Sequence, residues 1–422
     1  MPKGVSTCFR QKASLQGCLG KRNKESTLPF CVCGLIALQN YQSMAREDLT
    51  KAKRAKKDEF YTMLDDIALE LKHYKPYFKD KVVFCNCDDP YESNFFKYFA
   101  LNFNSFGLKK LIATCFNGSP IAGDELPLVF DVTGEEPKKT AYKVEISEVK
   151  DYNGDGAVNL TDVQYLIQND KNVLSLLKGN GDFRSQECIE LLKESDIVVT
   201  NPPFSLFREF VGMLDKYNKD FVIMGNTNTL VCKEVFKMFK EDRIRTGYTH
   251  FNTGMFFYVP DTFDKYHHIE NGRKVARVST SCWYTNLPVE KHKEFLDLYR
   301  HYTPEEYPKY DNYDAVNVDT YRDIPCDYDG VMGVPITFLD KYNPNQFEII
   351  WQASGNTYAN APKEILEELK FNPNIKYGGG LGAPVLNGKA TYTRVLIRRR
   401  QPKAVPYKAS ESSVPMAAEG NE

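Results

Sequence analysis

The tetrapeptide Asn-Pro-Pro-Phe at residues 201–204 holds groups that can act together on an exocyclic amine. The side-chain oxygen of Asn201 and the carbonyl of Pro202 are two acceptors, and an NH2 group has two hydrogens to donate. An amine held by both hydrogens loses conjugation, so its nitrogen can attack an electrophilic methyl group. Phe204 offers a stacking face, and Pro202 and Pro203 fix the backbone before substrate arrives.

The same tetrapeptide has a purely structural alternative. A Pro-Pro turn can end a strand, with Ser205 as the N-cap of the next helix. The apolar run 196–200 precedes the tetrapeptide and the amphipathic run 205–217 follows it. Ligands of open α/β sheets bind outside the carboxyl ends of the strands. This placement favours the chemical interpretation.

Three further segments are candidates for holding a methyl donor of the nucleotide type. Residues 81–90 read as a strand, a polar loop and the approach to a helix, which is the position of a nucleotide-binding loop. In "GNGDF" (179–183) the acid can accept from an adenine amino group and the phenylalanine can pack on its ring. "DEFYT" (58–62) precedes the first strand. The expected contacts are Phe60, Thr62, Cys85, Asn86, Asp88, Asp182 and Phe183.

The elements that must position these groups alternate between strand and helix along residues 81–224. Such alternation predicts an α/β protein with a mainly parallel sheet covered by helices on both faces. Two later runs, "THFNTGMFFYV" and "ARVSTSCWYTNL", predict antiparallel strands that finish the same sheet. The expected strands are 81–85, 109–116, 142–147, 196–200 and 220–224, and the expected helices are 64–74, 91–103 (closed by Gly107), 185–195 and 205–217.

Composition separates the two ends of the chain from its middle. Residues 1–57 carry 12 Lys/Arg and 3 Asp/Glu, whereas the whole 422-residue chain has a net charge of -1. A basic leader fits a polyanionic partner, although a solvated, partly disordered arm gives the same pattern. Residues 290–400, rich in Tyr, Asp, Asn, Pro and Gly, predict a loop-rich second lobe. The Ser/Pro/Ala/Glu-rich tail 401–422 predicts disorder.

Cysteine usage and hydropathy bear on the compartment. The 11 cysteines are scattered, and several stand in apolar runs, which predicts reduced thiols in a cytoplasmic protein. No apolar run approaches the roughly 18 residues that a membrane span needs.

A second constellation, "DYNGDGAVNLTD" (151–162), has the spacing of a calcium loop. Its oxygens suit a hard cation, and glycine at the sixth position permits the sharp turn. An Asx-rich turn without an ion is the alternative, and neither implies a catalytic role. The ligands of a structural calcium would be Asp151, Asn153, Asp155, Asn159 and Asp162.

The chain resembles the EcoRI-type N6-adenine DNA methyltransferases over roughly residues 45–400. The strings that carry the resemblance are "DEFYT", "VVFCNCDDPYESNF", "TNPPFSLFREFV", "YDNYDAVNV" and "IPCDYDGVMGVPITFLDKYNP". It implies a Rossmann-like methyltransferase core, S-adenosylmethionine as donor, double-stranded DNA as substrate and a C-terminal recognition lobe. Asn201, Pro202 and Phe204 match the catalytic motif, and Asp182 matches the adenine-contacting acid. The loop after residue 85 lacks the glycine that such enzymes generally carry. The second strand ends in Cys115-Phe116 rather than in the acid that usually holds the ribose in the family, so Asp88 or Asp89 would take that role.

The predicted organisation is a basic extension (1–57), a catalytic domain (58–290) with the calcium-loop-like insert, a DNA-recognition region (291–400) and the tail. The predicted function is site-specific transfer of methyl to adenine N6 with base flipping, alone or beside a cognate restriction endonuclease that acts separately. Two alternatives remain open. The same acceptors suit an RNA base or a glutamine amide of a protein, and the scaffold could bind DNA without catalysis.

Overall fold

The computed structural model describes residues 60–87, 90, 93–116, 141–169, 173–251, 253–261, 263–375, 378 and 380–400. The chain divides into two compact units between Arg54 and Ala55, and all of the described residues belong to the second. The predictions for residues 1–57, for Asp88 and for the tail 401–422 therefore fall outside the described residues.

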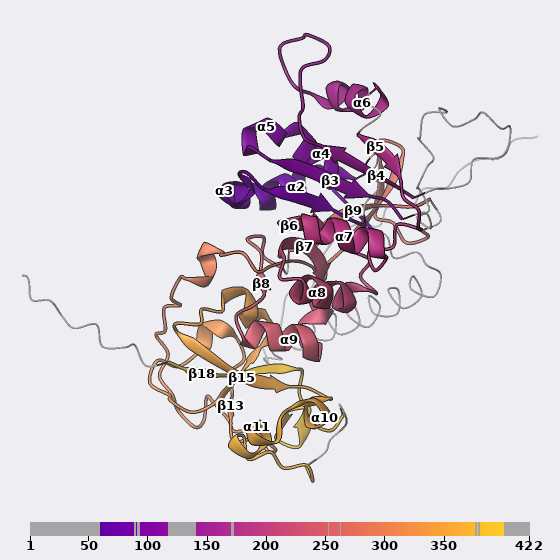
Figure 1. Cartoon of the computed structure of the whole chain (residues 1–422). Coiled ribbons are helices and arrows are strands. Elements are labelled where there is room, and N and C mark those ends of the chain that lie inside the picture. The colour runs from indigo at the N-terminus through magenta and orange to yellow at the C-terminus, as the bar shows by residue number, and fades with distance from the viewer. Residues whose placement is uncertain are drawn as a thin grey trace, which may run out of the picture. The chain divides into compact units, whose positions relative to one another are not determined.

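An eight-stranded sheet is the centre of this unit (Figure 1). Its order is β5-β4-β3-β2-β6-β7-β12-β8. The four strands β3, β2, β6 and β7 run parallel to one another, whereas β4, β5, β8 and β12 pair antiparallel. The sheet is therefore mixed rather than mainly parallel as predicted, because alternating elements do not fix the direction of the outer strands. The bounds are β2 (Val82–Cys85), β3 (Lys110–Thr114), β4 (Tyr142–Ile146), β5 (Leu174–Leu176), β6 (Ile197–Thr200), β7 (Asp220–Asn226), β8 (Arg245–Thr246) and β12 (Ser281–Thr285).

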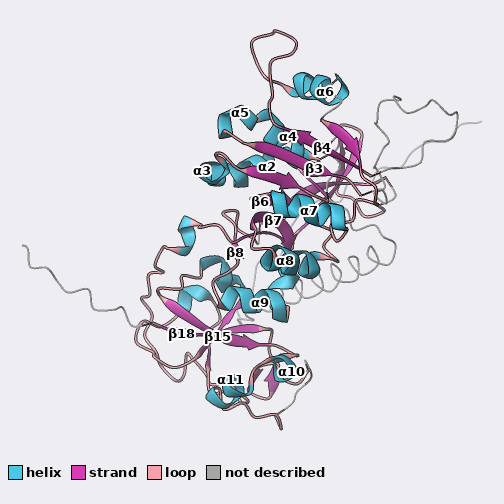
Figure 2. Ribbon diagram, viewed as in Figure 1, coloured by secondary structure: helices cyan, strands magenta, loops and turns pink. Residues whose placement is uncertain are grey.

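Helices cover both faces of this sheet, and the mixed α/β class is confirmed (Figure 2). The α-helices of the described residues are α2 (Leu64–Leu71), α3 (Lys75–Phe78), α4 (Asn94–Leu101), α5 (Phe103–Phe106), α6 (Leu160–Asn169), α7 (Gln186–Glu194), α8 (Phe207–Lys216), α9 (Lys233–Lys240), α10 (Thr357–Asn360) and α11 (Lys363–Glu368), of which the last two lie in the C-terminal region. The predicted helix 91–103 is divided, because Asn102 leaves helical geometry between α4 and α5. Gly107 closes α5 at φ 62°, a left-handed conformation that glycine adopts without strain.

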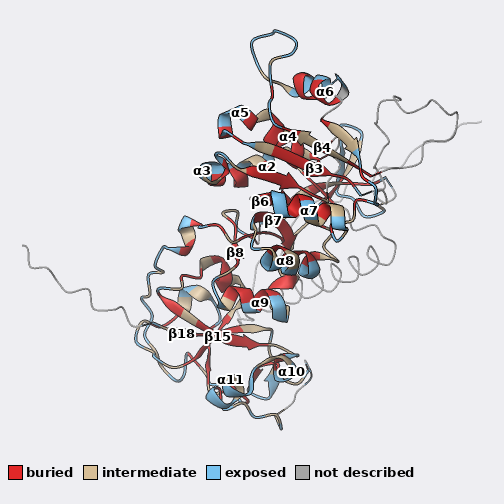
Figure 3. Ribbon diagram, viewed as in Figure 1, coloured by how far each residue is buried: buried red, intermediate tan, exposed pale blue. Residues whose placement is uncertain are grey.

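The strands bury both of their faces, which explains their continuous apolar runs. Phe84, Val198 and Ile223 face one way, in a single cluster with apolar side chains of α7, α8 and α9. On the other face, Trp283 of β12 meets Phe95 of α4 edge-on at 5.9 Å. Figure 3 shows the central strands in red, the colour of buried residues.

A separate four-stranded sheet corrects one prediction. Its order is β1-β9-β11-β10, with β1 (Tyr61–Thr62), β9 (Met255–Val259), β10 (His268–Glu270) and β11 (Arg273–Val278). The run "THFNTGMFFYV" therefore does not finish the main sheet, because β9 pairs with β1 and β11 instead. Only the second run supplies the main sheet, through β12. An apolar antiparallel strand does not encode its partner, which distant residues decide.

The C-terminal residues form a further sheet with order β13-β14-β18-β15 and a small hairpin of β16 and β17. The bounds are β13 (Val316–Asn317), β14 (Met332–Pro335), β15 (Phe347–Ala353), β16 (Val385–Leu386), β17 (Lys389–Ala390) and β18 (Arg394–Arg399). Elsewhere along the described residues the 3-10 turns η1 (Lys72–Tyr74), η2 (Thr227–Val231) and η3 (Glu290–His292) precede this region, and η4 (Tyr321–Asp323) and η5 (Ile336–Lys341) lie within it. Its core is continuous with that of the main sheet, since one buried cluster runs from Val82 to Ile397. Lys240 Nζ of α9 also donates to the Ile350 carbonyl over 2.8 Å.

The seven cysteines within the described ranges form no disulfide, in agreement with the thiols that the sequence predicts. Within those ranges, no helix has the length and apolar character that crossing a membrane requires.

Candidate active site

The tetrapeptide follows β6 and is hydrogen-bonded to two of the three predicted donor segments, 81–90 and 58–62. The hydroxyl of Thr200, the last residue of β6, donates to the Asn86 carbonyl. Asn201 Nδ2 donates to the Phe60 carbonyl and, over 3.3 Å, to Thr62 Oγ1. The structure thus brings the ends of β2 and β6 and the start of β1 together.

These bonds fix the orientation of the Asn201 amide. Both hydrogens of Nδ2 are engaged, so the opposite atom, Oδ1, remains an acceptor, and none of the described residues donates to it. The residue itself is buried, with 8% exposure. An amide oriented in this way presents an oxygen rather than an NH2 group to a ligand.

The two prolines differ in what their carbonyls do. The Pro203 carbonyl accepts from the Leu206 amide over 2.9 Å, whereas the Pro202 carbonyl accepts from no described backbone or side-chain group. Helix α8 begins at Phe207 with Leu206 as N-cap and without a side-chain cap. Ser205 is therefore not the N-cap, and the structural alternative loses the role that it assigned to this residue.

Aromatic rings surround the tetrapeptide. Phe204 stacks on Phe60 with ring centres 5.5 Å apart and an interplanar angle of 24°. Phe257 of β9 meets Phe60 edge-on at 5.9 Å, and Phe263 does so at 5.8 Å. Phe204 is half-buried, so part of its surface stays open to a planar ligand.

The end of β2 carries an unusual buried amide. Asn86 is 1% exposed, yet its Oδ1 and Nδ2 have no hydrogen-bond partner among the described residues. Cys85 directly before it is fully buried as the last residue of β2. Buried polar atoms are nearly always paired, so an orphaned amide at a strand's carboxyl end indicates a ligand's place.

The loop 179–183 approaches the end of β3 closely. A Cβ on Gly181, where φ is +76°, would lie 1.9 Å from the Cys115 carbonyl oxygen. Arg184 forms two hydrogen bonds with the carboxylate of Asp182. Nε donates to Oδ1 over 2.8 Å, and Nη2 donates to Oδ2 over 2.6 Å. This pairing holds the pKa of Asp182 below its usual range. Phe183 is 5% exposed and packs edge-on against Phe210 of the core.

The calcium-loop-like segment gives the calcium expectation no support. Asp162 is 1% exposed, and its carboxylate accepts from the amides of Tyr152, Asn153 and Asn159. The Asp151 carboxylate likewise accepts from backbone amides of the loop, and Asn153 and Asn159 both donate to Asp155 Oδ2. Within the described ranges, these acids are not among the groups that could share an ion. These hydrogen bonds are those that the alternative, an Asx-rich turn, predicts.

Sequence reasoning missed several side chains of the site. Thr200 stands directly before the tetrapeptide, and a polar residue closing an apolar strand could have pointed to it. Arg184 follows Asp182 by two residues, which is a readable spacing for a local ion pair. Phe257 and Phe263 come from residues far along the chain, so no local signal could have found them.

The chain is similar in sequence to known methyltransferases. A family model described as "Adenine-specific methyltransferase EcoRI" matches residues 48–400. The chain is 43% identical over 360 residues to "Type II methyltransferase M.EcoRI" of Escherichia coli, covering 84% of this chain and 96% of that protein. It is 38% identical over 359 residues to "Type II methyltransferase M.MpnI" of Mycoplasma pneumoniae, covering 83% and 98%. No solved structure matches the chain.

Proposed function

Because the chain belongs to the EcoRI family of adenine-specific methyltransferases, it is an adenine-specific DNA methyltransferase, and we propose that the end of β6 carries its chemistry. The observation that carries the proposal is the fixed amide of Asn201, with Nδ2 engaged by the Phe60 carbonyl and the Thr62 hydroxyl. This arrangement leaves Oδ1 as an acceptor beside the Pro202 carbonyl.

In the proposed mechanism, Asn201 Oδ1 and the Pro202 carbonyl accept the two hydrogens of the adenine N6 amine. The amine then loses conjugation with the ring, and its lone pair becomes nucleophilic. Phe204 stacks on the adenine, while Pro202 and Pro203 hold the acceptors in place before binding. Adenine in a duplex must first be extruded, which costs a few kcal/mol and is offset by stacking and phosphate contacts.

S-adenosylmethionine, which the family implies as methyl donor, supplies an electrophilic methyl group on a sulfonium. The orphaned amide of Asn86 fits such a ligand, because a nucleoside donor brings polar groups that would satisfy it. Asp182 would accept from the adenine amino group of the donor if it exchanges part of its pairing with Arg184. The proposed set is Phe60, Thr62, Cys85, Asn86, Asp88, Asp182 and Phe183.

The finer organisation is also proposed. The four parallel strands with helices on both faces support a Rossmann-like core within 58–290. The loop-rich region 291–400 would read the DNA site, with residues 1–57 contacting phosphates. A cognate restriction endonuclease would act as a separate protein on the same sequence.

The test is methyl transfer by the full chain from radiolabelled S-adenosylmethionine to methylase-free DNA, to RNA and to protein extract. We expect label in DNA at adenine N6, abolished in Asn201→Ala. The matched control is Asn169→Ala, an exposed asparagine of α6 whose loss should leave the rate unchanged. An unaltered rate in Asn201→Ala would end the catalytic assignment. Label in RNA or protein, or no label at all, would favour the alternatives.

A further inference from the structure

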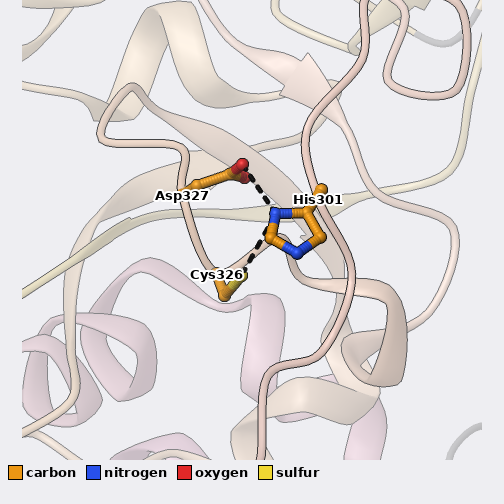
Figure 4. A group of neighbouring side chains, drawn as sticks. All are labelled: His301, Cys326 and Asp327. Atoms are coloured by element: carbon orange, nitrogen blue, oxygen red, sulfur yellow. Dashed lines mark hydrogen bonds and ion pairs between the residues drawn. The ribbon is translucent and has the colours of Figure 1, made fainter.

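Three potential metal ligands meet outside the proposed active site. His301, Cys326 and Asp327 each offer one ligand atom, and these atoms all lie within 4.8 Å of one another (Figure 4). The Asp327 Oδ2 to His301 Nδ1 distance is 2.9 Å, and Cys326 Sγ lies 3.8 Å from the same nitrogen. Figure 4 shows the thiol and the carboxylate on one loop and the imidazole on the neighbouring segment.

The backbone around the three groups is held in place. Arg300 and Pro325 form a parallel bridge, and the Cys326 amide donates to the Arg300 carbonyl over 2.8 Å. The Tyr302 amide donates to the second carboxylate oxygen, Asp327 Oδ1, over 2.8 Å. Two segments that are 25 residues apart therefore carry their ligands in a fixed relation before any ion arrives.

The distances are close to those around a tetrahedral zinc ion. Bond lengths of about 2.3 Å to sulfur and about 2.0 Å to nitrogen or oxygen separate the ligand atoms by roughly 3.3–3.5 Å at tetrahedral angles. The observed 2.9 and 3.8 Å lie on either side of that range. A thiolate, an imidazole and a carboxylate together suit zinc, whereas hard cations such as Mg²⁺ and Ca²⁺ avoid thiolate.

The charges of the neighbourhood also suit a divalent cation. Arg300 pairs with Asp323 at 3.5 Å, and Arg399 pairs with Asp329 at 2.8 Å. The nearby guanidinium charges are thus compensated by other acids. A deprotonated Cys326 and the Asp327 carboxylate would add two negative charges, which a Zn²⁺ ion balances.

A Cys-His-Asp nucleophilic relay is the competing use of these residue types. In such a relay the thiol and the carboxylate engage opposite nitrogens of the imidazole. Here both approach Nδ1, so the carboxylate cannot orient a ring whose other nitrogen activates the thiol. Convergence on one nitrogen is instead the geometry of a shared ion.

We propose that His301, Cys326 and Asp327 form a zinc site with solvent as the fourth ligand, which clamps residues 300–302 to residues 325–327. Binding releases the thiol proton, and no further chemistry is needed. The clamp stabilises the C-terminal region without touching the proposed methyl-transfer site.

Cobalt(II) replaces zinc as a coloured probe in the test. Titration of the full chain, previously stripped with a chelator, should give a thiolate-to-cobalt charge-transfer band in the near ultraviolet and tetrahedral bands in the visible. Added zinc should bleach them. The absorbance of the charge-transfer band should fall in Cys326→Ser by the amount that one thiolate ligand contributes. It should be unchanged in the matched control Cys232→Ser, which removes another half-buried free cysteine. The difference between variants separates this site from cysteines elsewhere in the chain.

A second measurement does not depend on colour. Zinc should raise the Tm of the wild-type chain in a concentration-dependent way, and this shift should shrink in Cys326→Ser and in His301→Gln. Circular dichroism checks that both variants fold. A charge-transfer band that is absent from wild type or unchanged in Cys326→Ser would overturn the proposal, as would an equal Tm shift in all variants.

Discussion

The Thr62 hydroxyl and the Phe60 carbonyl both accept hydrogen bonds from Asn201 Nδ2. The Thr62 hydroxyl is therefore a positioning group in the proposed site. A hydrogen bond of this kind contributes about 1 kcal/mol, which corresponds to roughly a fivefold change. We expect Thr62→Val to lower the single-turnover rate of DNA methylation by about that factor, because the amide gains freedom to rotate.

Thr62→Ser keeps the hydroxyl and should restore most of the rate. Rapid-quench measurement at saturating DNA and methyl donor separates the rate from binding. Equal rates for wild type and Thr62→Val would show that the Phe60 carbonyl alone orients Asn201.

For individual residues of the site, the sequence predicts which residues take part better than it predicts which neighbours they contact. The sequence predicts Asn201 on the substrate amine and Phe60 and Thr62 on the methyl donor, and the structure brings the three residues into contact. Phe183 was expected on the donor's adenine, yet its ring packs mainly in the core. A single phenylalanine does not reveal which of its neighbours will cover it.

Among the elements, the turn 179–183 depends on one glycine. Gly181→Ala would place a methyl group 1.9 Å from the Cys115 carbonyl oxygen in a left-handed conformation. The turn must move away from the end of β3, carrying Asp182 with it. We expect weaker binding of S-adenosylmethionine, measured by isothermal titration calorimetry, with the far-ultraviolet circular dichroism unchanged.

The control is Gly212→Ala in helix α8, where a Cβ meets no atom within 4 Å. That substitution should leave binding intact and raise the free energy of unfolding by about 0.5–1 kcal/mol. Wild-type affinity in Gly181→Ala would contradict a role for this turn in donor binding.

The elements themselves were largely predictable where the pattern was local. The apolar runs at 81–85 and 196–200 correspond to β2 and β6, and the helix predicted over 185–195 is α7, with Ser185 as its N-cap. The partner of β9 was predicted wrongly, because antiparallel pairing joins residues nearly two hundred positions apart. The same limit hides His301 and Cys326, which the bridge between Arg300 and Pro325 and the hydrogen bonds beside it bring together.

For the molecule as a whole, a buried histidine couples the main sheet to the C-terminal region. His292 Nδ1 lies 2.8 Å from the Tyr342 carbonyl, and Nε2 lies 3.2 Å from Thr246 Oγ1 on β8. Burial lowers the pKa of His292 below its usual 6.5. Burial therefore favours the neutral imidazole in the folded state. Nε2 also lies 3.0 Å from the Thr246 carbonyl, which can only accept a hydrogen bond.

The lowered pKa of His292 makes the free energy of unfolding depend on pH in a definite direction. Between the folded and unfolded pKa values the unfolded chain binds more protons, so stability is full above about pH 6.5 and falls as the pH drops below it. The slope from one group is at most about 1.4 kcal/mol per pH unit. Urea unfolding at pH 7.5 and 5.5 should show this loss.

His292→Gln should be less stable than wild type at pH 7.5 but lose less on acidification, because the titrating group is gone. His267→Gln, at an exposed position, should keep the wild-type dependence. A wild-type pH slope in His292→Gln would assign the acid sensitivity to other groups.

The pairing of β1 with β9 sets Thr62 opposite Phe257 and Tyr61 opposite Tyr258. Side chains alternate between the two faces of a strand, so a shift of one position would turn the Thr62 hydroxyl away from Asn201. The insertion or deletion of a single residue in β9 should therefore abolish activity as completely as a substitution of Asn201. During divergence of this lineage, β9 can exchange amino acids far more freely than it can change length.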